Sequence, residues 1–167
     1  MPLSFLPKII APSLTALEVS FLENQGIRLL MLDFDNTIVP YTTDVPTQEM
    51  DTWLRSILAS NIRVCVVSNT KKNRAPAFCS KYGMDIITHA GKPFGDGIKK
   101  CLQKYGISPK ECALVGDQIY TDTLGANLNG VRSILIPAIQ NHNFWLKLRH
   151  VAELPFIFFA RKRRMQK

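Results

Sequence analysis

The sequence predicts an α/β protein: one doubly wound, Rossmann-like domain with a five-stranded parallel sheet and no cap domain. Short apolar runs alternate with longer segments of helical periodicity, which is the pattern of parallel strands covered on both faces by helices. The chain of 167 residues has the length of a single domain. Its residues are 46% hydrophobic and 20% charged, which excludes a disordered chain.

Five largely apolar runs are the expected strands. They lie at residues 29–32, 64–67, 85–87, 113–115 and 133–136. Four segments between them carry apolar residues at helical spacing, at residues 50–58, 73–82, 98–105 and 124–128. Pro46-Thr47 is a suitable start for the first helix, and Gly83 and Gly106 are suitable ends for the next two. Upstream, residues 14–22 place apolar side chains on one helical face, so we expect a helix there that covers the sheet.

We expect residues 1–167 to form a single domain, with an apolar and helical lead-in at 1–26 and an amphipathic segment with a basic tail at 141–167. The formal net charge is +8, and from Lys147 onward the chain has seven basic residues and one acid. Aromatic residues at 156–159 precede four consecutive basic residues, a pattern typical of a membrane interface. The alternative is a C-terminal helix packed on the core with a solvated end.

Neither a membrane span nor a secretory signal is expected. No apolar run approaches the roughly 18–20 residues of a span, and the first residues lack the pattern of a signal peptide. The cysteines show no C-x-x-C pair and no zinc-ligand spacing, so we interpret all four as reduced thiols: Cys65, Cys79, Cys101 and Cys112. We therefore expect a cytoplasmic protein that is peripherally associated with a membrane, or one in an equivalent reducing compartment.

Two carboxylates end the first expected strand. Asp33 and Asp35 follow residues 29–32, and ligands in open α/β sheets bind beyond the carboxyl ends of the strands. The two carboxylates repel each other unless a cation lies between them, and a hard cation such as Mg²⁺ suits oxygen ligands. An Asp-rich turn without a metal is the alternative interpretation.

Further polar groups follow the next strands. Ser68 and neighbouring backbone N–H groups can hold phosphate oxygens, although serine is also an ordinary helix cap. Lys92 precedes a helix, where a lysine is usually a surface charge. Asp117 directly follows the fourth strand and is the natural third oxygen ligand, and Asp122 adds another carboxylate.

In this order and spacing the groups resemble the haloacid-dehalogenase-like (HAD) phosphatase superfamily. Its signatures are DxDxT, a Ser or Thr at a strand end, a lysine and a GD(x)nD acidic motif, and all of them occur here. More narrowly, the chain is similar to the capless subclass IIIA and its YqeG-type members, relatives of the mitochondrial phosphatidylglycerophosphate phosphatases. The Pro-rich lead-in and the segments GIRLL, DFDNTIVP, VVSN and AGKPF carry this narrower resemblance.

The resemblance implies a reaction through an aspartyl-phosphate. Asp33 would be the nucleophile, and Asp35 would protonate the leaving group and then deprotonate water. Mg²⁺ would be held by Asp33, the Asp35 carbonyl and Asp117. Lys92 would complete the catalytic set by stabilising charge on the phosphoryl group.

The resemblance also implies residues around the phosphate. Ser68 would bind phosphoryl oxygens, and Asn69 would support Ser68 or touch the phosphate. Thr37 would orient the catalytic loop, and it is counted with Ser68 and Asn69 as substrate-binding. Asp122 would lie outside the metal ligands and hold Lys92 or a metal-bound water.

The absence of a long insertion leaves the expected site open to large substrates. Only residues 38–46 could cover it, as a short flap with Tyr41 as a candidate substrate contact. Three basic residues after the second strand could flank the mouth, but we interpret them as exposed helix charges: Lys71, Lys72 and Arg74. The histidines receive no role in the site: His89, His142 and His150.

Three functions are consistent with the sequence. The leading one is Mg²⁺-dependent dephosphorylation of phosphatidylglycerophosphate, a phospholipid phosphomonoester, to phosphatidylglycerol at an anionic membrane surface. The second is a soluble phosphatase for a sugar phosphate or nucleotide, for which the tail would be dispensable. The third is a nucleic-acid-binding module that uses the basic tail. That third function leaves the acidic cluster unexplained, so we expect no nucleic-acid partner; the oligomeric state stays open.

Overall fold

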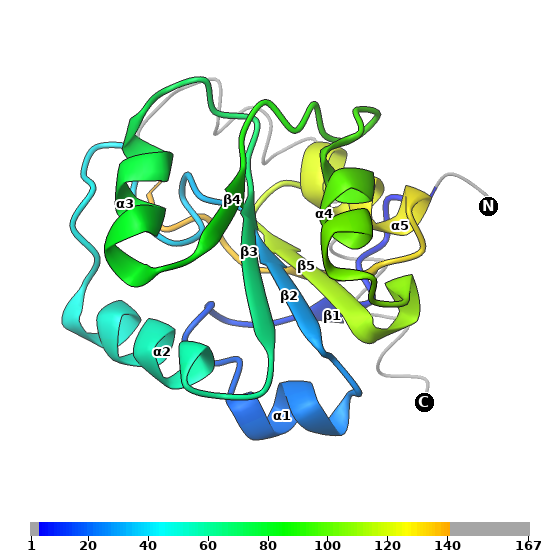
Figure 1. Cartoon of the computed structure of the whole chain (residues 1–167), viewed down its shortest axis with the longest axis horizontal. Helices are drawn as coiled ribbons and strands as arrows, with labels where there is room; N and C mark the ends of the chain where they lie inside the picture. Colours follow the sequence, from blue (N-terminus) through cyan, green and yellow to red (C-terminus); the bar gives the residue numbers. More distant parts are fainter. Residues whose placement is uncertain (1–3, 141–167) are drawn as a thin grey trace.

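The computed structural model describes residues 4–140, which form one parallel sheet covered by helices on both faces (Figure 1). The sheet has six strands in the order β1-β6-β5-β2-β3-β4, and every neighbouring pair is parallel. The predicted class, α/β with a doubly wound parallel sheet, is therefore confirmed. No cap domain occurs within residues 4–140.

Five of the six strands lie where the apolar runs predict them. Their bounds are β2 (Leu29–Leu32), β3 (Arg63–Val67), β4 (Asp85–Ile87), β5 (Cys112–Gly116) and β6 (Arg132–Leu135). Every residue of β2 and of β5 is buried. This is expected of central strands in a sheet that helices cover on both faces.

The sixth strand corrects the predicted count of five. β1 (Ile9–Ile10) pairs in parallel with β6, and the register places Ile9 opposite Ile134. Pro7 and Pro12 bound this short run, and proline is confined to sheet edges because it lacks the N–H that a central strand must donate. A two-residue strand between prolines is too short to show the apolar pattern by which the other five were predicted.

The helices follow the sequence pattern closely. Their bounds are α1 (Val19–Asn24), α2 (Gln48–Leu58), α3 (Arg74–Tyr82), α4 (Gly97–Tyr105) and α5 (Leu124–Leu128), with a 3₁₀ turn η1 (Pro109–Glu111) and a π-helical turn η2 (Ile119–Thr123). Thr47 caps α2, because its hydroxyl accepts a hydrogen bond from the Met50 N–H (3.2 Å). Gly83 and Gly106 end α3 and α4 in the left-handed conformation, as predicted.

The predicted helix over residues 14–22 is only partly formed. α1 begins at Val19, and residues 14–17 instead form a turn in which the Leu17 N–H donates to the Leu14 carbonyl (3.0 Å). The Ser13 hydroxyl accepts from the Ala16 N–H (3.1 Å), and the backbone is extended at Glu18 (φ −62°, ψ 147°), which separates this turn from α1. Leu14 and Leu17 are both buried, so the apolar pattern predicted their burial correctly and their conformation wrongly.

Alternating strand residues face two apolar layers. In β2, Leu30 and Leu32 pack into the layer beneath α1, α2 and α3, whereas Leu29 and Met31 pack into the layer beneath α4 and α5 (Figure 1). All four cysteines are buried in these layers as free thiols, as predicted. The two packed layers fix the strands, and therefore fix the positions of the residues that follow them.

Several sequence predictions fall outside the described residues. Within residues 4–140 no helix is both long and apolar enough to cross a membrane. The amphipathic segment and basic tail at 141–167, with His142 and His150, lie outside the described range. The single domain over residues 1–167 accordingly stays a prediction for the two ends.

Candidate active site

The candidate site lies where the strand order reverses. β2 sits between β3 and β5, and the chain runs outward through β3 and β4 before it returns to β5. Asp33, Ser68 and Asp117 directly follow β2, β3 and β5, so they converge at the carboxyl edge of the sheet. The Asp33 N–H donates to the Val115 carbonyl (2.9 Å), which extends the β2–β5 pairing to this position.

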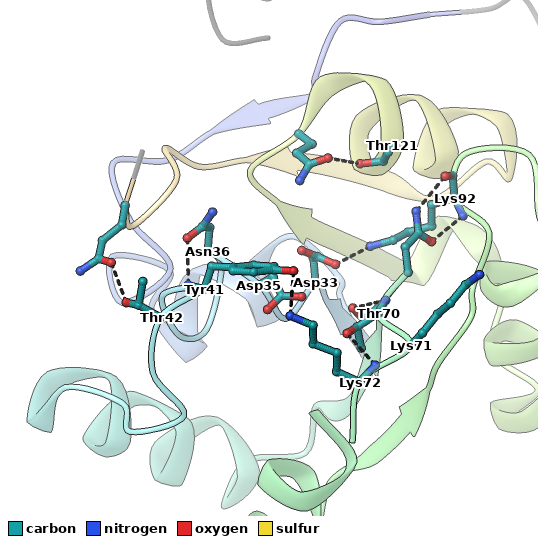
Figure 2. A pocket seen from close by; sticks show the side chains of 14 residues that line it. Asp33, Asp35, Asn36, Tyr41, Thr42, Thr70, Lys71, Lys72, Lys92 and Thr121 are labelled. Carbon is teal, nitrogen blue, oxygen red and sulfur yellow. Dashed lines mark hydrogen bonds and ion pairs between the residues drawn. The ribbon is translucent and has the colours of Figure 1, made fainter. Parts of the chain in front are cut away.

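A buried lysine joins two carboxylates at this edge. The Lys92 Nζ lies 2.8 Å from Asp33 Oδ1, a contact drawn in Figure 2, and 2.7 Å from Asp122 Oδ1. Only 2% of the Lys92 side chain is exposed. Burial alone would lower the pKa of Lys92, but the carboxylates of Asp122 and Asp33 raise it above its usual value. Lys92 is therefore a charged member of the site, and not the surface charge that a lysine before a helix usually is.

Asn69 fixes the loop that carries this lysine. Its Oδ1 accepts from the Lys92 N–H (2.8 Å), and its Nδ2 donates to the Lys92 carbonyl (3.0 Å). The sequence did not predict this contact. The predicted contact of Asn69 with phosphate stays a prediction, whereas its role in holding Lys92 is visible in the structure.

Gly116 gives Asp122 its place. A Cβ at this glycine would lie 2.3 Å from the Asp122 carboxyl carbon, a separation that real atoms do not adopt. The Asp122 Oδ2 accepts from the Gln118 N–H (3.1 Å), and Oδ1 contacts Lys92. The glycine of the GD(x)nD pattern therefore allows the second aspartate to pack against the strand end and hold the lysine.

Burial raises the pKa values of two carboxyls in the cluster. The pKa of Asp33 is raised to about 6 by burial, against the lowering effect of Lys92. The pKa of Asp117 is raised to about 8 by burial and by the carboxylates of Asp122 and Asp33. One lysine does not offset this much buried negative charge, so the cluster favours an additional cation.

The acidic cluster fits a divalent metal ion. Asp33, Asp117 and Asp122 each offer one carboxylate oxygen, and these three atoms lie within 4.8 Å of one another. Asp117 Oδ1 is buried and has no hydrogen-bond partner among residues 4–140. Leaving a buried oxygen unpaired is costly, and a hard cation is a suitable partner for it. This geometry does not test the predicted ligand at the Asp35 carbonyl.

Asp35 is held by Arg74. The Arg74 Nη1 lies 2.7 Å from Asp35 Oδ1, and 12% of the Arg74 side chain is exposed. Burial raises the pKa of Asp35, and the positive charges of Arg74 and Lys72 act against the rise. The interpretation of Arg74 as an exposed helix charge was wrong, because its guanidinium turns into the flap and is covered there.

Ser68 and Thr37 differ in their access to substrate. Ser68 lines the cavity beside Asp33, and its Oγ accepts from the Thr70 N–H (3.2 Å). Thr37 is fully buried, and its Oγ1 has no hydrogen-bond partner within the described range 4–140. Its burial behind the catalytic loop favours the loop-orienting role over direct contact with substrate.

Asp33, Asp35, Ser68, Asn69 and Lys92 line an open cavity of about 590 Å³. We call the floor the buried set made of Asp33 and Lys92, which line the cavity, with Asp117 and Asp122, each of which has a carboxylate oxygen within 4.8 Å of one on Asp33. We call the side chains at its outer end the rim: Tyr41, Thr42, Lys71 and Lys72. Figure 2 shows Tyr41, Lys71 and Lys72 around the cavity with Asp33 and Lys92 deeper inside it.

The rim is positively charged, in contrast to the floor. The Lys72 Nζ donates to the Tyr41 Oη (3.2 Å) and lies 4.7 Å from the centre of the Tyr41 ring. Among residues 4–140, no carboxylate lies within ion-pair distance of Lys71 or Lys72. Both lysines are exposed, which agrees with their interpretation from sequence as exposed charges. Both also line the cavity, which agrees with the alternative that they flank its mouth.

Sequence reasoning missed some of the lining. Thr121 donates to Gln118 (3.1 Å), and both line the cavity from the turn between Asp117 and Asp122. Their place inside the acidic motif was a usable signal. Gln140, which accepts from Thr42 (3.0 Å), had none. His89 is exposed, its Nδ1 lies 3.2 Å from the Thr88 hydroxyl, and it is not among the residues that line the cavity.

Comparison with known proteins identifies the family of this chain. The family described as mitochondrial PGP phosphatase, where PGP is phosphatidylglycerophosphate, matches residues 1–138, a range that holds the floor and the rim. The chain belongs to this family. It is thus a phosphatase, and the resemblance to YqeG-type proteins and phosphatidylglycerophosphate phosphatases inferred from the sequence is confirmed.

Individual relatives agree with the assignment. The chain is 27% identical over 150 residues to the "Probable phosphatase YqeG" of Bacillus subtilis, a match that covers 89% of this chain and 87% of that protein. It is 30% identical over 144 residues to the mitochondrial phosphatidylglycerophosphatase GEP4 of Saccharomyces cerevisiae, covering 78% and 76%. It is 24% identical to the chloroplastic phosphatidylglycerophosphate phosphatase 1 of Chlamydomonas reinhardtii, of which it spans about half (51%).

Solved structures share the fold. An uncharacterised protein from Listeria monocytogenes matches with a TM-score of 0.55 at 17% identity, over 78% of this chain and 98% of that one. The cobalt-bound deoxy-D-mannose-octulosonate 8-phosphate phosphatase of Haemophilus influenzae matches with a TM-score of 0.54 at 10% identity, over 75% of each chain. At these identities the likeness concerns the fold alone.

Proposed function

We propose that this phosphatase is Mg²⁺-dependent, forms an aspartyl-phosphate on Asp33, and dephosphorylates phosphatidylglycerophosphate at the surface of an anionic membrane. The observation that carries the proposal is the buried floor at the end of an open cavity, where the Asp33 carboxylate contacts Lys92 beside an unpaired Asp117 oxygen. The names of the yeast and Chlamydomonas relatives support the lipid substrate.

In the first step, a carboxylate oxygen of Asp33 attacks phosphorus and the bond to the leaving alcohol breaks. Lys92 orients this carboxylate and offsets negative charge as the phosphate approaches. Asp35 gives its proton to the departing alkoxide. Burial raises the pKa of Asp35, which favours the protonated form that this step needs.

In the second step, water attacks the phosphorus of the aspartyl-phosphate. Asp35, now a carboxylate, takes a proton from this water, and the bond between Asp33 and phosphorus breaks. Inorganic phosphate leaves, and both aspartates return to their starting protonation states. Ser68, at the cavity surface, donates a hydrogen bond from its hydroxyl to a phosphoryl oxygen in both steps.

Asp33, Asp117 and the Asp35 carbonyl would hold the magnesium ion, and Asp122 would keep Lys92 in place. When bound, Mg²⁺ neutralises the repulsion between carboxylate and phosphate. The unpaired Asp117 Oδ1 and the raised pKa values of Asp33 and Asp117 support an ion at this place.

The rim supports a substrate that stays in a membrane. No cap stands over the cavity within residues 4–140, so a headgroup at a lipid surface can reach the floor. Phosphatidylglycerophosphate carries a phosphodiester beside its terminal phosphate, and Lys71 and Lys72, which line the cavity, would supply positive charge to attract this second anion. The basic residues of the tail would add roughly 1 kcal/mol of attraction each to an anionic leaflet.

A phosphate-release screen tests the proposal. The purified chain with Mg²⁺ is given phosphatidylglycerophosphate in phosphatidylcholine vesicles, glycerol 3-phosphate, a sugar phosphate and a nucleotide, with Asp33→Asn as the inactive control. We expect kcat/KM to be at least about tenfold higher for the lipid. Flotation with vesicles containing anionic lipid is expected to carry the protein upward.

The outcomes separate the parts of the proposal. Equal or faster turnover of a soluble phosphate, with no flotation, would replace the lipid substrate by the second candidate, a soluble phosphatase. Full activity in the Asp33→Asn protein would reject the nucleophile, and full activity in a chelator would reject the metal.

A further inference from the structure

Arg74 uses its whole hydrogen-bonding capacity at the flap. A guanidinium has five N–H groups, and five acceptors surround this one. Nη1 donates to Asp35 Oδ1 (2.7 Å) and to the Tyr41 carbonyl (3.0 Å). Nη2 donates to the carbonyls of Pro40 (2.9 Å) and Thr43 (2.6 Å). Nε donates to the Asp44 carboxylate.

Aromatic rings complete the enclosure. The guanidinium carbon lies 5.2 Å from the centre of the Phe34 ring and 5.7 Å from that of Tyr41, within the range of cation–π attraction. Phe34 is the residue between Asp33 and Asp35, and Tyr41 belongs to the flap. Arg74 is thus in contact with the catalytic loop and with the segment that covers the cavity.

The position of Arg74 in its helix does not explain these contacts. It is the first residue of α3, and no acidic residue lies in the first turn of that helix. A cation at a helix N-terminus is unfavourable with respect to the helix dipole, typically by a few tenths of a kcal/mol. The contacts with Asp35 and the flap therefore outweigh the unfavourable interaction with the helix dipole. They account for the position of the Arg74 side chain.

We propose that Arg74 is a positioning residue for the phosphatase reaction: it holds the Asp35 carboxylate at the leaving-group side of the cavity and fixes residues 40–44 of the flap to the same point. The inference rests on the proton-transfer role proposed for Asp35. Arg74 does not touch the substrate, and it acts through Asp35 and through the carbonyls of the flap.

The contact of Arg74 with Asp35 and its contact with Asp44 have different effects. Without the contact to Arg74, the Asp35 carboxyl can rotate away from the orientation in which it protonates the alkoxide. Loss of the Asp44 contact loosens the flap and leaves Asp35 bound. A lysine cannot replace the arginine, since an ammonium has three N–H donors and no planar fork.

The positioning role of Arg74 can be tested with two substrates whose leaving groups differ in their need for a proton. An aryl phosphate such as p-nitrophenyl phosphate releases a stable anion, whereas an alkyl phosphate needs its alkoxide protonated. We expect Arg74→Gln to lower kcat on glycerol 3-phosphate about 10- to 100-fold, and on p-nitrophenyl phosphate less than about 3-fold. Arg74→Lys should give the same selective loss at an intermediate size. Hydrogen exchange of the flap amides is expected to accelerate in both variants.

Matched variants separate the contacts. Asp44→Asn removes the flap ion pair alone, so we expect faster flap exchange and a raised KM with the leaving-group preference unchanged. Lys81→Gln changes an exposed cation on the same helix and should alter neither measurement. Thermal melts check that each variant is folded, and Arg74→Lys keeps the charge if Arg74→Gln does not fold.

The Asp35→Asn protein distinguishes failure of the inference from failure of the proposed function. If Asp35→Asn loses alkyl phosphatase activity selectively and the Arg74 variants lose both activities equally, the positioning role is rejected and the role of Asp35 stands. If Asp35→Asn shows no preference between the two leaving groups, the proposed proton transfer and the inference built on it are both rejected. A selective loss in all three proteins supports both.

Discussion

The floor and the rim of the cavity are built in opposite ways. The floor consists of buried side chains at the ends of β2 and β5 and in the segments after β4 and β5, and within it Lys92 joins Asp33 to Asp122 through short ion pairs. The rim consists of exposed side chains on the flap and on the turn after β3. This difference supports the proposal that the floor, fixed by the sheet, carries out the chemistry, while the rim, in loops that can vary without disturbing the sheet, selects the substrate.

The first and largest expected effect is on the floor. Asp33→Asn removes the proposed nucleophile, so we expect kcat to fall by at least about 10³-fold. The melting temperature should stay within a few degrees, because burial already disfavours the Asp33 charge and has raised its pKa to about 6. Phosphate release and a thermal melt measure the two quantities. Asp96→Asn, at an exposed aspartate paired with Lys100, is the matched control and should be silent in both.

Lys92→Met tests whether the buried ion pairs stabilise the fold. It leaves the Asp33 and Asp122 carboxylates uncompensated, and breaking a buried pair in this way costs about 3–5 kcal/mol. The loss should grow as pH rises, since the unpaired carboxyls can avoid the penalty only while they are protonated. Urea unfolding at pH 5 and pH 8 measures it.

Lys100→Met is the matched control for that lysine. It breaks an exposed pair with Asp96 and should cost less than about 1 kcal/mol. Equal losses in the two variants would contradict the view that the floor differs from the surface. Lys92→Met combined with Asp122→Asn should recover part of the stability and none of the activity.

The third effect concerns pH and metal. The folded pKa of Asp117, raised to about 8, lies above its value of 3.8 in the unfolded chain. The contribution of Asp117 to the free energy of unfolding is therefore full below about pH 4 and is lost as pH rises through about 8, by roughly 1.4 kcal/mol for each unit of pKa difference at most. In a chelator, the melting temperature should fall across this window, and Asp117→Asn should flatten the fall.

Magnesium should reverse the pattern. An ion that binds the ionised carboxylates stabilises the folded state more at pH 8 than at pH 5, because fewer protons have to be displaced. Melts with and without Mg²⁺ at the two pH values measure this difference. Asp117→Asn should abolish most of the gain, and an equal gain at both pH values would contradict a site that includes Asp117.

The floor was predictable from sequence because its signals are local. Asp33 and Asp117 directly follow apolar strands, and the chain order of strands and helices implies that their ends meet. The position of Asp122 followed from its motif, but its close approach to Gly116 was not predicted, because Asp122 lies in a π-helical turn that the sequence pattern does not reveal. Five strands followed from apolar runs, whereas β1 is too short to be distinguished from its flanking prolines.

The rim and its supports were less predictable, because they depend on contacts between distant segments. Arg74 looks like a surface charge in the sequence, and its five partners lie 30 or more residues away. Asn69 is expected from sequence to support Ser68 or touch the phosphate, and its contact with the backbone of Lys92, 23 residues away, was not predicted. Residue type alone does not reveal such a partner, since an arginine or asparagine side chain can also form its hydrogen bonds with water.

The smallest expected effect is on the rim. Lys71→Gln with Lys72→Gln removes two unpaired cations from the mouth, and exposed charges contribute little because solvent and salt screen them. We expect the KM for phosphatidylglycerophosphate in vesicles to rise about 3- to 10-fold, with kcat on p-nitrophenyl phosphate unchanged. Lys99→Gln with Lys110→Gln removes the same charge away from the cavity and should leave both constants unaltered. If the control raised KM equally, general attraction to the membrane would explain the effect. If only the rim variant did so, and only for the substrate with a second phosphate, the rim would be the part of the site that recognises the lipid headgroup.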